Sequence, residues 1–324
     1  MDLQLLDKVP SKHMLILGDV MLDRYTTGNA DRQSPEAPVP ILSVEKTFAR
    51  LGGAANVALN IKALGAQATI IGVVGADDAG DLLYQTCKRH GVNAHLVQDK
   101  SRRTTVKHRY LSKGKHLLRV DDEDLHDISQ EVANELMSHL ESILDDVSGV
   151  IISDYNKGCL TKDVIDVVLQ MCKMSSVPVY VDPKFNNFQL YKGVRIFKPN
   201  LKELHAGLGD FASPVEELIR ETHEVLGCDS VICTMASKGI AYVKGGAVGV
   251  VPAETLEIVD VSGAGDTVMA VSALADQCGM KIQEICKLSN IAGKIVCLQS
   301  GVVSVCLEDL KKEACRPSAD KKIL

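Results

Sequence analysis

The sequence predicts an α/β protein built on a doubly wound, mostly parallel sheet with helices on both faces. Short apolar runs alternate with amphipathic helical patterns along most of its 324 residues, of which 46% are hydrophobic. Strands that alternate with helices favour parallel pairing, and a chain of this length can bury a large core. We therefore expect a single domain over residues 1–324 that carries a small β-lid.

The elements follow from the period of the apolar residues. Short apolar runs predict strands at 13–17, 68–74, 150–153, 177–182, 195–198, 230–234 and 240–243. Helical spacing predicts helices at 54–64, 80–90, 130–144, 162–172, 214–226 and 268–276. Two stretches, 24–46 and 94–121, lack helical period and are expected to form the lid. The charged segment 311–324 is expected to be a frayed tail.

Composition excludes several classes of protein. The net charge of −6 argues against a nucleic-acid-binding surface, and no run of eighteen apolar residues predicts a membrane span. The N-terminus lacks the basic start and apolar stretch of a signal peptide. Ten cysteines without a Cys-x-x-Cys pair suit a reducing compartment. We therefore expect a cytoplasmic protein that binds neither nucleic acid nor membrane.

The most informative stretch is 260–267 (DVSGAGDT), between a β-prone segment and a predicted helix. Gly263 and Gly265, with Ala264 between them, let the backbone approach a ligand, and their N–H groups at a helix N-terminus favour an anion. Asp266 adds a carboxylate to this turn. A kinase would explain both features, because Asp266 could take a proton from an attacking hydroxyl beside a phosphate. An ordinary turn capped by Ser262 or Asp266 is the alternative.

Polar residues near the start of the chain suit a sugar. Gly52 and Gly53 open a helix and permit close approach of a ligand, and Asn56 could bond to a hydroxyl. Asp19 and Asp23 follow the first strand, and ionised carboxylates accept hydrogen bonds from neighbouring hydroxyls. Each feature is also common in ordinary turns and helix entries, so none of them decides alone.

Basic residues are concentrated in the second lid stretch of an otherwise acidic chain. Most such charges are simply solvated. Alternation along a strand places Lys107 and Arg109 on one face, however, where they could bind an anionic substrate such as a sugar phosphate.

The segment 200–203 has two compatible interpretations. Pro199 followed by Asn200 and, three residues later, Glu203 is a helix capping box. The same Asn200 and Glu203 could lie near Mg²⁺ and the phosphates of ATP, directly or through water.

Together, 52–56, 200–203 and 260–267 resemble the paired signatures and the Mg-phosphate motif of the ribokinase-like (PfkB) carbohydrate kinases. The resemblance runs from about residue 13 to 305. The longer strings at 18–25, 34–40, 153–158 and 182–184 resemble the heptose-7-phosphate kinase branch of that family.

The resemblance implies a ribokinase-like fold, with ATP and Mg²⁺ as cofactors and a monovalent cation as a further candidate. The reaction would be transfer of the ATP γ-phosphate to the anomeric 1-hydroxyl of D-glycero-β-D-manno-heptose 7-phosphate, on the route to ADP-heptose and lipopolysaccharide. Asp266 would be the base, and the N–H groups of residues 263–265 would stabilise the transferring phosphoryl group. Asp19, Asp23, Gly52, Gly53 and Asn56 would bind the sugar.

Two further sets of residues follow from the resemblance. The candidates for the 7-phosphate are Lys107, Arg109, Lys157 and Lys184. The residues expected to bind the nucleotide are Asn200, Leu201, Lys202, Glu203, Thr234, Ser237, Gly239 and Asn290, with Mg²⁺ at Glu203 and Asn200. Ala236 departs from the family pattern Thr-x-Gly-x-x-Gly, which puts the nucleotide contacts there in doubt.

Relatives in this family pair their lids, which implies a homodimer. Many also carry a C-terminal nucleotidyltransferase domain that 324 residues cannot hold. We therefore expect a kinase-only form or part of a longer chain, with a separate nucleotidyltransferase downstream. The alternatives are another sugar kinase, such as a phosphofructokinase-like enzyme, and a non-catalytic sugar-phosphate sensor.

Overall fold

The computed structural model describes residues 1–254, 258–299 and 301–316. Across these residues the main sheet has nine strands in the order β13-β12-β11-β10-β9-β8-β1-β4-β5. Pairing is parallel from β11 to β5, and β12 and β13 pair antiparallel at the other edge. Its strands are β1 (His13–Gly18), β4 (Gln67–Gly75), β5 (Asn93–Asp99), β8 (Gly149–Ser153), β9 (Val179–Asp182), β10 (Ile196–Phe197), β11 (Ser230–Thr234), β12 (Ile240–Lys244) and β13 (Ala247–Val251).

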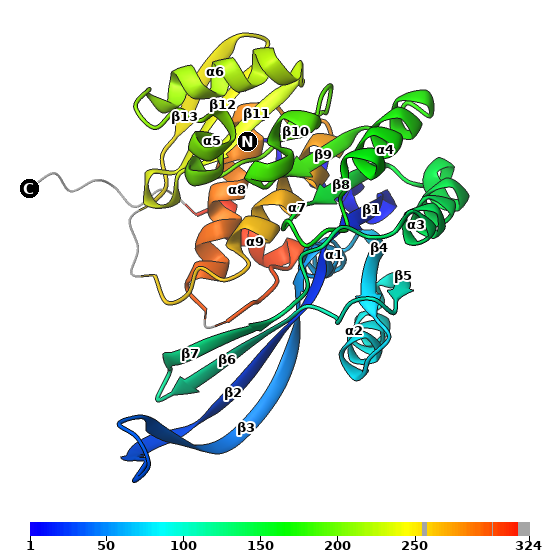
Figure 1. The fold of residues 1–324 in the computed structure, drawn as a ribbon. Helices are drawn as coiled ribbons and strands as arrows, with labels where there is room; N and C mark the ends of the chain where they lie inside the picture. Colours follow the sequence, from blue (N-terminus) through cyan, green and yellow to red (C-terminus); the bar gives the residue numbers. More distant parts are fainter. Residues whose placement is uncertain (255–257, 300, 317–324) are drawn as a thin grey trace, which may run out of the picture.

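Helices cover both faces of this sheet, which confirms the predicted fold class (Figure 1). Alternate residues of β1 face opposite layers of helices. Ile16 packs in one apolar cluster, and Leu15 and Leu17 pack in the other. The first layer holds α1 (Ala54–Ala63), α2 (Asp78–Arg89), α7 (Ala264–Gln277), α8 (Ile282–Cys297) and α9 (Leu307–Ala314). The second holds α3 (Gln130–Ile143), α4 (Lys162–Met174), α5 (Leu201–Leu208) and α6 (Val215–Leu226).

Side-chain caps fix where several helices begin. The side chains of Asp77, Ser129 and Thr161 accept a backbone N–H at the start of α2, α3 and α4. The described residues also form four 3₁₀ segments: η1 (Leu3–Ser11), η2 (Leu144–Asp146), η3 (Phe185–Leu190) and η4 (Ala236–Lys238). No helix within the described ranges is long and apolar enough to cross a bilayer.

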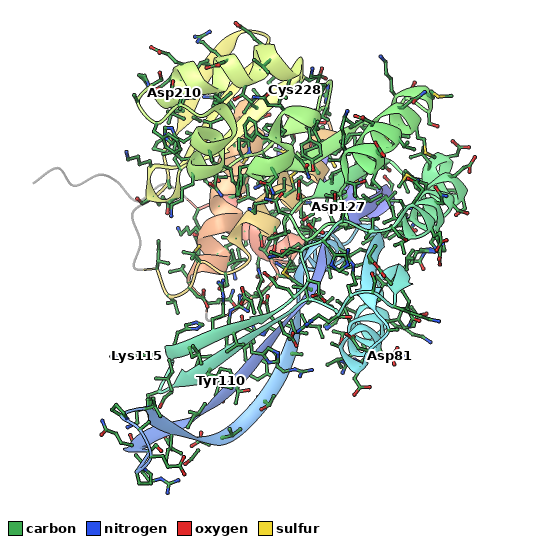
Figure 2. All side chains as sticks on the ribbon, in the orientation of Figure 1. Asp81, Tyr110, Lys115, Asp127, Asp210 and Cys228 are labelled. Carbon is green, nitrogen blue, oxygen red and sulfur yellow. The ribbon has the colours of Figure 1, made fainter. Side chains whose placement is uncertain are left out.

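The lid is a separate sheet with the order β3-β2-β6-β7, which projects from the body (Figures 1 and 2). Its strands are β2 (Val20–Gln33), β3 (Pro40–Gly53), β6 (Val106–Ser112) and β7 (Lys115–Asp122). Only one residue separates β1 from β2, and β3 ends directly before α1. The lid therefore continues directly from β1 and leads directly into α1.

Two predicted boundaries are wrong. Residues 94–99 lie in β5, which pairs with β4 at the edge of the main sheet, so they are not part of the lid. Val97 is buried in the core there. The sequence pattern indicated a strand, but it did not show which sheet the strand would join. The tail prediction also began too early, because Leu310 is buried and α9 continues to Ala314. Residues 317–324 lie outside the described part of the chain.

Ala236 adopts φ of 50°, a left-handed conformation that glycine tolerates better than alanine. The position that departs from the family pattern is therefore strained. Ala236→Gly should raise the free energy of unfolding by about 0.5–1 kcal/mol, since the relieved strain outweighs the added freedom of the unfolded chain. Urea denaturation measures this. As the control, Ala206→Gly on the exposed side of α5 should lower stability by about 1 kcal/mol. Equal losses in both variants would contradict the assignment of strain.

Candidate active site

The candidate site lies where several strands of the main sheet end and the lid begins. Asp19 follows β1, Asp154 and Tyr155 follow β8, and Asp182 ends β9. The N-terminus of α7 completes the group, because Asp266 in its first turn bonds to Tyr155. The carboxyl ends of parallel strands are the usual place for a ligand in such sheets.

Asp266 is buried, with 5% of its surface exposed. Its Oδ2 accepts a hydrogen bond from Asn56 Nδ2 at 2.7 Å, and its Oδ1 accepts one from the Tyr155 hydroxyl at 2.5 Å. Burial raises the pKa of Asp266, and these two hydrogen bonds oppose the rise. The result is a carboxylate held in one orientation and made more basic than an exposed aspartate.

The turn before Asp266 has the shape that an anion requires. Gly263 caps α7 with φ of 79°, and a Cβ there would come within 2.8 Å of Asn56 Nδ2. The first N–H groups of a helix have no acceptor inside it, so those of Gly265 and Asp266 are available to a ligand. The N–H of Ala264, in contrast, donates to Val261 O at 3.2 Å.

Lys198 adds positive charge beside this turn and was not among the predicted site residues. Its Nζ lies 2.9 Å from Asp182 Oδ1, and a Cβ on Gly265 would lie 3.9 Å from that nitrogen. Burial raises the pKa of Asp182 to about 6, although Lys198 acts in the opposite direction. The only sequence signal for Lys198 is its place between a strand and the capping box at 200–203.

Asp19 holds the loop that carries Tyr155. Its carboxylate accepts the backbone N–H groups of Tyr155 at 2.7 Å, Lys157 at 3.1 Å and Cys159 at 3.3 Å. With 3% of its surface exposed, this predicted sugar ligand has a structural role in the loop. Asn56 likewise exposes 0% of its surface and bonds to Asp266, whereas the sequence predicted a bond to the sugar.

Acidic partners neutralise three of the four cations predicted for the sugar phosphate. Arg109 pairs with Asp23 across the lid strands, Lys157 pairs with Glu123 and Lys184 pairs with Glu203. Sequence patterns cannot show such pairs, since the partners come from distant elements.

Lys107 is the exception. Within residues 1–254, 258–299 and 301–316 no carboxylate lies within ion-pair distance of its ammonium group. Burial lowers the pKa of Lys107, although Asp23 acts in the opposite direction. Its Nζ lies 5.7 Å from the centre of the Tyr155 ring. An anion beside this lysine would restore the electrostatic balance.

The two glycines before α1 are buried against the predicted acidic ligands. A Cβ on Gly52 would come within 2.7 Å of Asp23 Oδ2. Gly53 has φ of 57° and caps α1, and a Cβ there would come within 2.5 Å of Asp19 O. Both positions therefore require glycine because the backbone passes close to its neighbours.

The capping box at α5 is confirmed. Glu203 N donates to Asn200 Oδ1, and Asn200 N donates to Glu203 Oε2, both at 2.9 Å. Glu203 Oε1 is paired with Lys184. Leu201 packs against the core and Lys202 is exposed, so only Lys202 of these two could reach a ligand in solvent.

The remaining residues predicted for the nucleotide surround the β11–β12 connection. Thr234 N donates to Pro199 O at 3.0 Å, which joins this connection to the start of α5. Gly239 has φ of 93° and Ser237 is exposed. Asn290 Nδ2 donates to Val251 O at 3.0 Å, so its amide holds the backbone at the end of β13.

The donor set fits Mg²⁺ only in a hydrated form. The described residues contain no group of three His, Cys, Asp or Glu side chains able to enclose a metal ion. Glu203, with Asp182 near it, could hold Mg²⁺ through water while nucleotide phosphates supply the other ligands.

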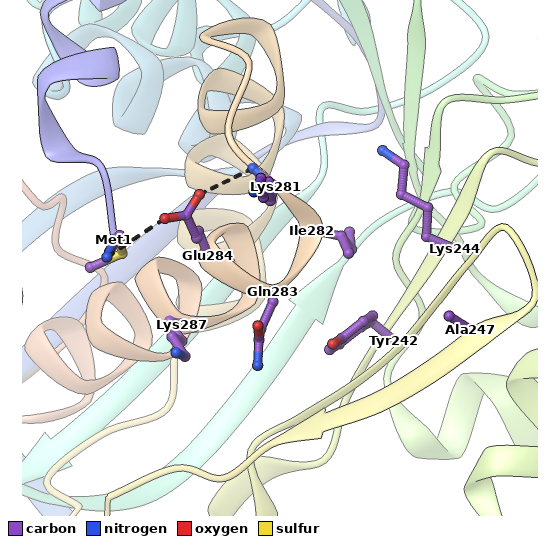
Figure 3. Close-up of a pocket in the computed structure, with 9 residues that line it drawn as sticks. All are labelled: Met1, Tyr242, Lys244, Ala247, Lys281, Ile282, Gln283, Glu284 and Lys287. Carbon is purple, nitrogen blue, oxygen red and sulfur yellow. Dashed lines mark hydrogen bonds and ion pairs between the residues drawn. The ribbon is translucent and has the colours of Figure 1, made fainter.

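A pocket elsewhere in the structure does not coincide with this site. It lies between β12 and the first turns of α8 and is lined by Tyr242, Lys281 and Lys287 among others (Figure 3). None of the predicted site residues lines it.

A helix N-terminus suited to an anion, a buried carboxylate beside it and a β-lid continuous with the flanking strands define a small-molecule kinase of the α/β class. The family model for "pfkB family carbohydrate kinase" matches residues 11–310. The chain therefore belongs to the PfkB family of carbohydrate kinases. The family implies ATP, and typically Mg²⁺, as cofactors.

Similar proteins agree with this assignment. "Bifunctional protein HldE" of Caulobacter vibrioides is 41% identical over 323 residues, which cover 95% of this chain and 64% of the relative. The protein of the same name from Pseudomonas aeruginosa strain UCBPP-PA14 is 37% identical over 312 residues, 95% of this chain and 65% of the relative. The chain thus spans somewhat less than two thirds of these relatives.

Solved structures show the same fold. Phosphofructokinase-2 from Escherichia coli in complex with potassium superposes with a TM-score of 0.79 at 18% identity, covering 94% of this chain and 98% of that one. A putative ribokinase from Agrobacterium tumefaciens superposes with a TM-score of 0.74 at 18% identity, covering 93% of this chain and 96% of that one. The ribokinase-like fold is therefore confirmed.

The buried Asp19 carboxylate should make stability depend on pH. Burial and the neighbouring Asp154 raise its pKa from 3.8 to about 6. The folded protein then binds this proton more tightly than the unfolded chain does. The contribution of Asp19 to the free energy of unfolding is therefore fully present below about pH 4, and it is lost as the pH rises through about 6. Asp19→Asn removes this dependence. Its loss of stability relative to wild type should be larger at pH 4 than at pH 7 by about 1–3 kcal/mol, measured by urea denaturation.

Asp166→Asn, which removes an exposed carboxylate from α4, serves as the control for a change of net charge. If Asp19→Asn costs the same stability at both pH values, Asp19 does not retain a proton in the folded state.

Proposed function

We propose that this chain transfers the γ-phosphate of ATP to the anomeric 1-hydroxyl of D-glycero-β-D-manno-heptose 7-phosphate, giving the 1,7-bisphosphate. The observation that carries the chemistry is the Asp266 carboxylate, fixed by Asn56 and Tyr155 at the N-terminus of α7. The heptose rests on the sequence strings at 18–25, 34–40, 153–158 and 182–184, and on the similarity to HldE over 95% of the chain.

Asp266 acts as the general base. Its raised pKa makes it a better acceptor for the proton of the attacking hydroxyl, and burial keeps water from competing. The N–H groups at the start of α7 and the Lys198 ammonium group lie beside it, where negative charge on the transferring phosphoryl group is stabilised. Mg²⁺, when bound near Glu203, would neutralise charge on the nucleotide phosphates.

The product is an anomeric phosphate, which a nucleotidyltransferase can activate. We propose such an enzyme downstream, in the cytoplasm, as the consumer of this product. The lid also exposes apolar side chains, with 60% of Val44 and 57% of Leu118 accessible, which supports the proposal that two copies pair through their lids.

Asp266→Asn should lower kcat by about 10²–10⁴-fold while the protein remains folded, because the amide cannot take the proton. Turnover of ATP with Mg²⁺ is measured across heptose 7-phosphate, fructose phosphates, ribose and adenosine. Asp81→Asn, an exposed carboxylate on α2, is the control and should keep wild-type kcat (Figure 2).

The outcomes of this panel separate the alternatives. Turnover confined to heptose 7-phosphate supports the full proposal. Turnover with another acceptor that still needs Asp266 rejects the heptose and keeps the kinase. Binding of a sugar phosphate by wild type without turnover favours a sensor.

Lys107→Met should raise KM for heptose 7-phosphate by about 10–100-fold, since its ammonium group has no carboxylate partner among the described residues and is free to bind the phosphate. Turnover with the same heptose lacking the phosphate should be unaffected. Lys113→Met is the matched control, because this lid lysine is exposed and pairs with Asp31 at 2.7 Å. Equal effects on the two sugars would show that Lys107 does not bind the phosphate.

A further inference from the structure

Tyr155 contacts both the proposed base and two of the candidate cations. Its hydroxyl donates to Asp266 Oδ1 at 2.5 Å. Burial raises the pKa of Tyr155 well above its ordinary value, and the Asp266 charge adds to the effect. The hydroxyl therefore stays protonated and remains a donor at every pH at which the enzyme would work.

The ring is held on its faces as well as at its hydroxyl. Lys107 Nζ lies 5.7 Å and Lys184 Nζ lies 5.2 Å from the ring centre, distances at which an ammonium group is attracted to an aromatic face. Lys107 comes from β6 of the lid and Lys184 from the segment after β9. Asp19 fixes the backbone N–H of Tyr155 at 2.7 Å.

The two oxygens of Asp266 differ in how firmly they are held. Oδ2 is bonded to Asn56, which exposes 0% of its surface. Asn60 Nδ2 in turn bonds to Asn56 O at 2.9 Å, and Thr267 Oγ1 donates to Asn60 Oδ1 at 3.0 Å. Removing Asn56 from Oδ2 would break this buried network. Tyr155 is only partly buried, whereas Asn56 is fully buried, so the partner of Oδ1 is the less enclosed of the two.

We propose that Tyr155 is a positioning residue that occupies Oδ1 of Asp266 until the acceptor hydroxyl of the sugar takes its place. A hydroxyl that gives its proton to Asp266 must approach one of the two oxygens, and Oδ1 is the one whose partner is less enclosed. Water is a smaller and weaker competitor than a bound sugar, so the Tyr155 hydroxyl restrains ATP hydrolysis. This inference rests on the proposed function, because it takes Asp266 as the base.

Tyr155→Phe removes the hydroxyl and keeps the ring that the two lysines contact. Since the hydrogen bond from Tyr155 lowers the pKa of Asp266, its loss raises that pKa. The acid limb of kcat/KM for the sugar should move to higher pH by on the order of one unit. ATP hydrolysis without sugar should rise about tenfold, as Oδ1 becomes open to water.

Tyr180→Phe is the matched control. Its hydroxyl donates to Asp276 at 2.8 Å near the other end of the same helix, so the variant removes an equivalent Tyr–Asp bond away from the site. Both its pH profile and its hydrolysis rate should equal those of wild type. An unchanged acid limb in Tyr155→Phe, or a shift of the same size in Tyr180→Phe, overturns the proposal.

A measurement on wild type does not depend on the variant folding. The chain has seven tyrosines and no tryptophan, so tyrosine emission is directly visible. A carboxylate bonded to a tyrosine hydroxyl quenches emission, and saturating heptose 7-phosphate without nucleotide should therefore increase it. Unchanged emission at saturation overturns the inference.

Failure of the inference is distinct from failure of the proposed function. If Asp266→Asn keeps its turnover, Asp266 is not the base and the proposed chemistry is wrong. If Asp266→Asn is inactive and Tyr155→Phe has the wild-type pH profile, the chemistry stands and only the role of Tyr155 is rejected.

Discussion

The buried Asp266 carboxylate at the start of α7 is the constraint on which the rest of the site depends. A charge taken out of water is costly unless it is hydrogen-bonded, and here two side-chain donors and a helix N-terminus offset that cost. Each donor needs its own support. Asn56 is held by Asn60, while the backbone of Tyr155 is held by Asp19. Residues far apart in the chain are therefore fixed by one ionised group.

Charge balance explains why so many predicted binding cations are already paired. Asp19, Asp182 and Asp266 are all buried around the ends of the strands, and burial raises the pKa of each. Lys198 lies among them and pairs with Asp182. Such a site can receive a polyanion only where cations exceed carboxylates. Lys107, beside Tyr155, and the N–H groups of α7, beside Asp266, provide that excess.

Sequence patterns were sufficient for features that depend on neighbouring residues. The strand–helix alternation predicted the sheet, and the glycines beside Asp266 predicted the turn, because both follow from local backbone requirements. Partners across the fold could not be predicted. Nothing local to Arg109 indicates that Asp23 neutralises it, and β5 looks like a lid strand until its pairing with β4 is known. Tyr155 was part of a recognised string, but its contact with Asp266 is set by tertiary packing alone.

The lid strands are joined through the backbone to residues that hold Asp266, the proposed base. β2 starts one residue after β1, with Asp19 between them, and β3 ends at Gly53, which caps the helix that carries Asn56. A displacement of the lid therefore acts on Asp19 and Asn56 through the backbone, and on Tyr155 through Lys107. All three residues hold Asp266 or the loop beside it. A ligand that draws the lid inward would thus act on the proposed base through covalent structure as well as through contacts.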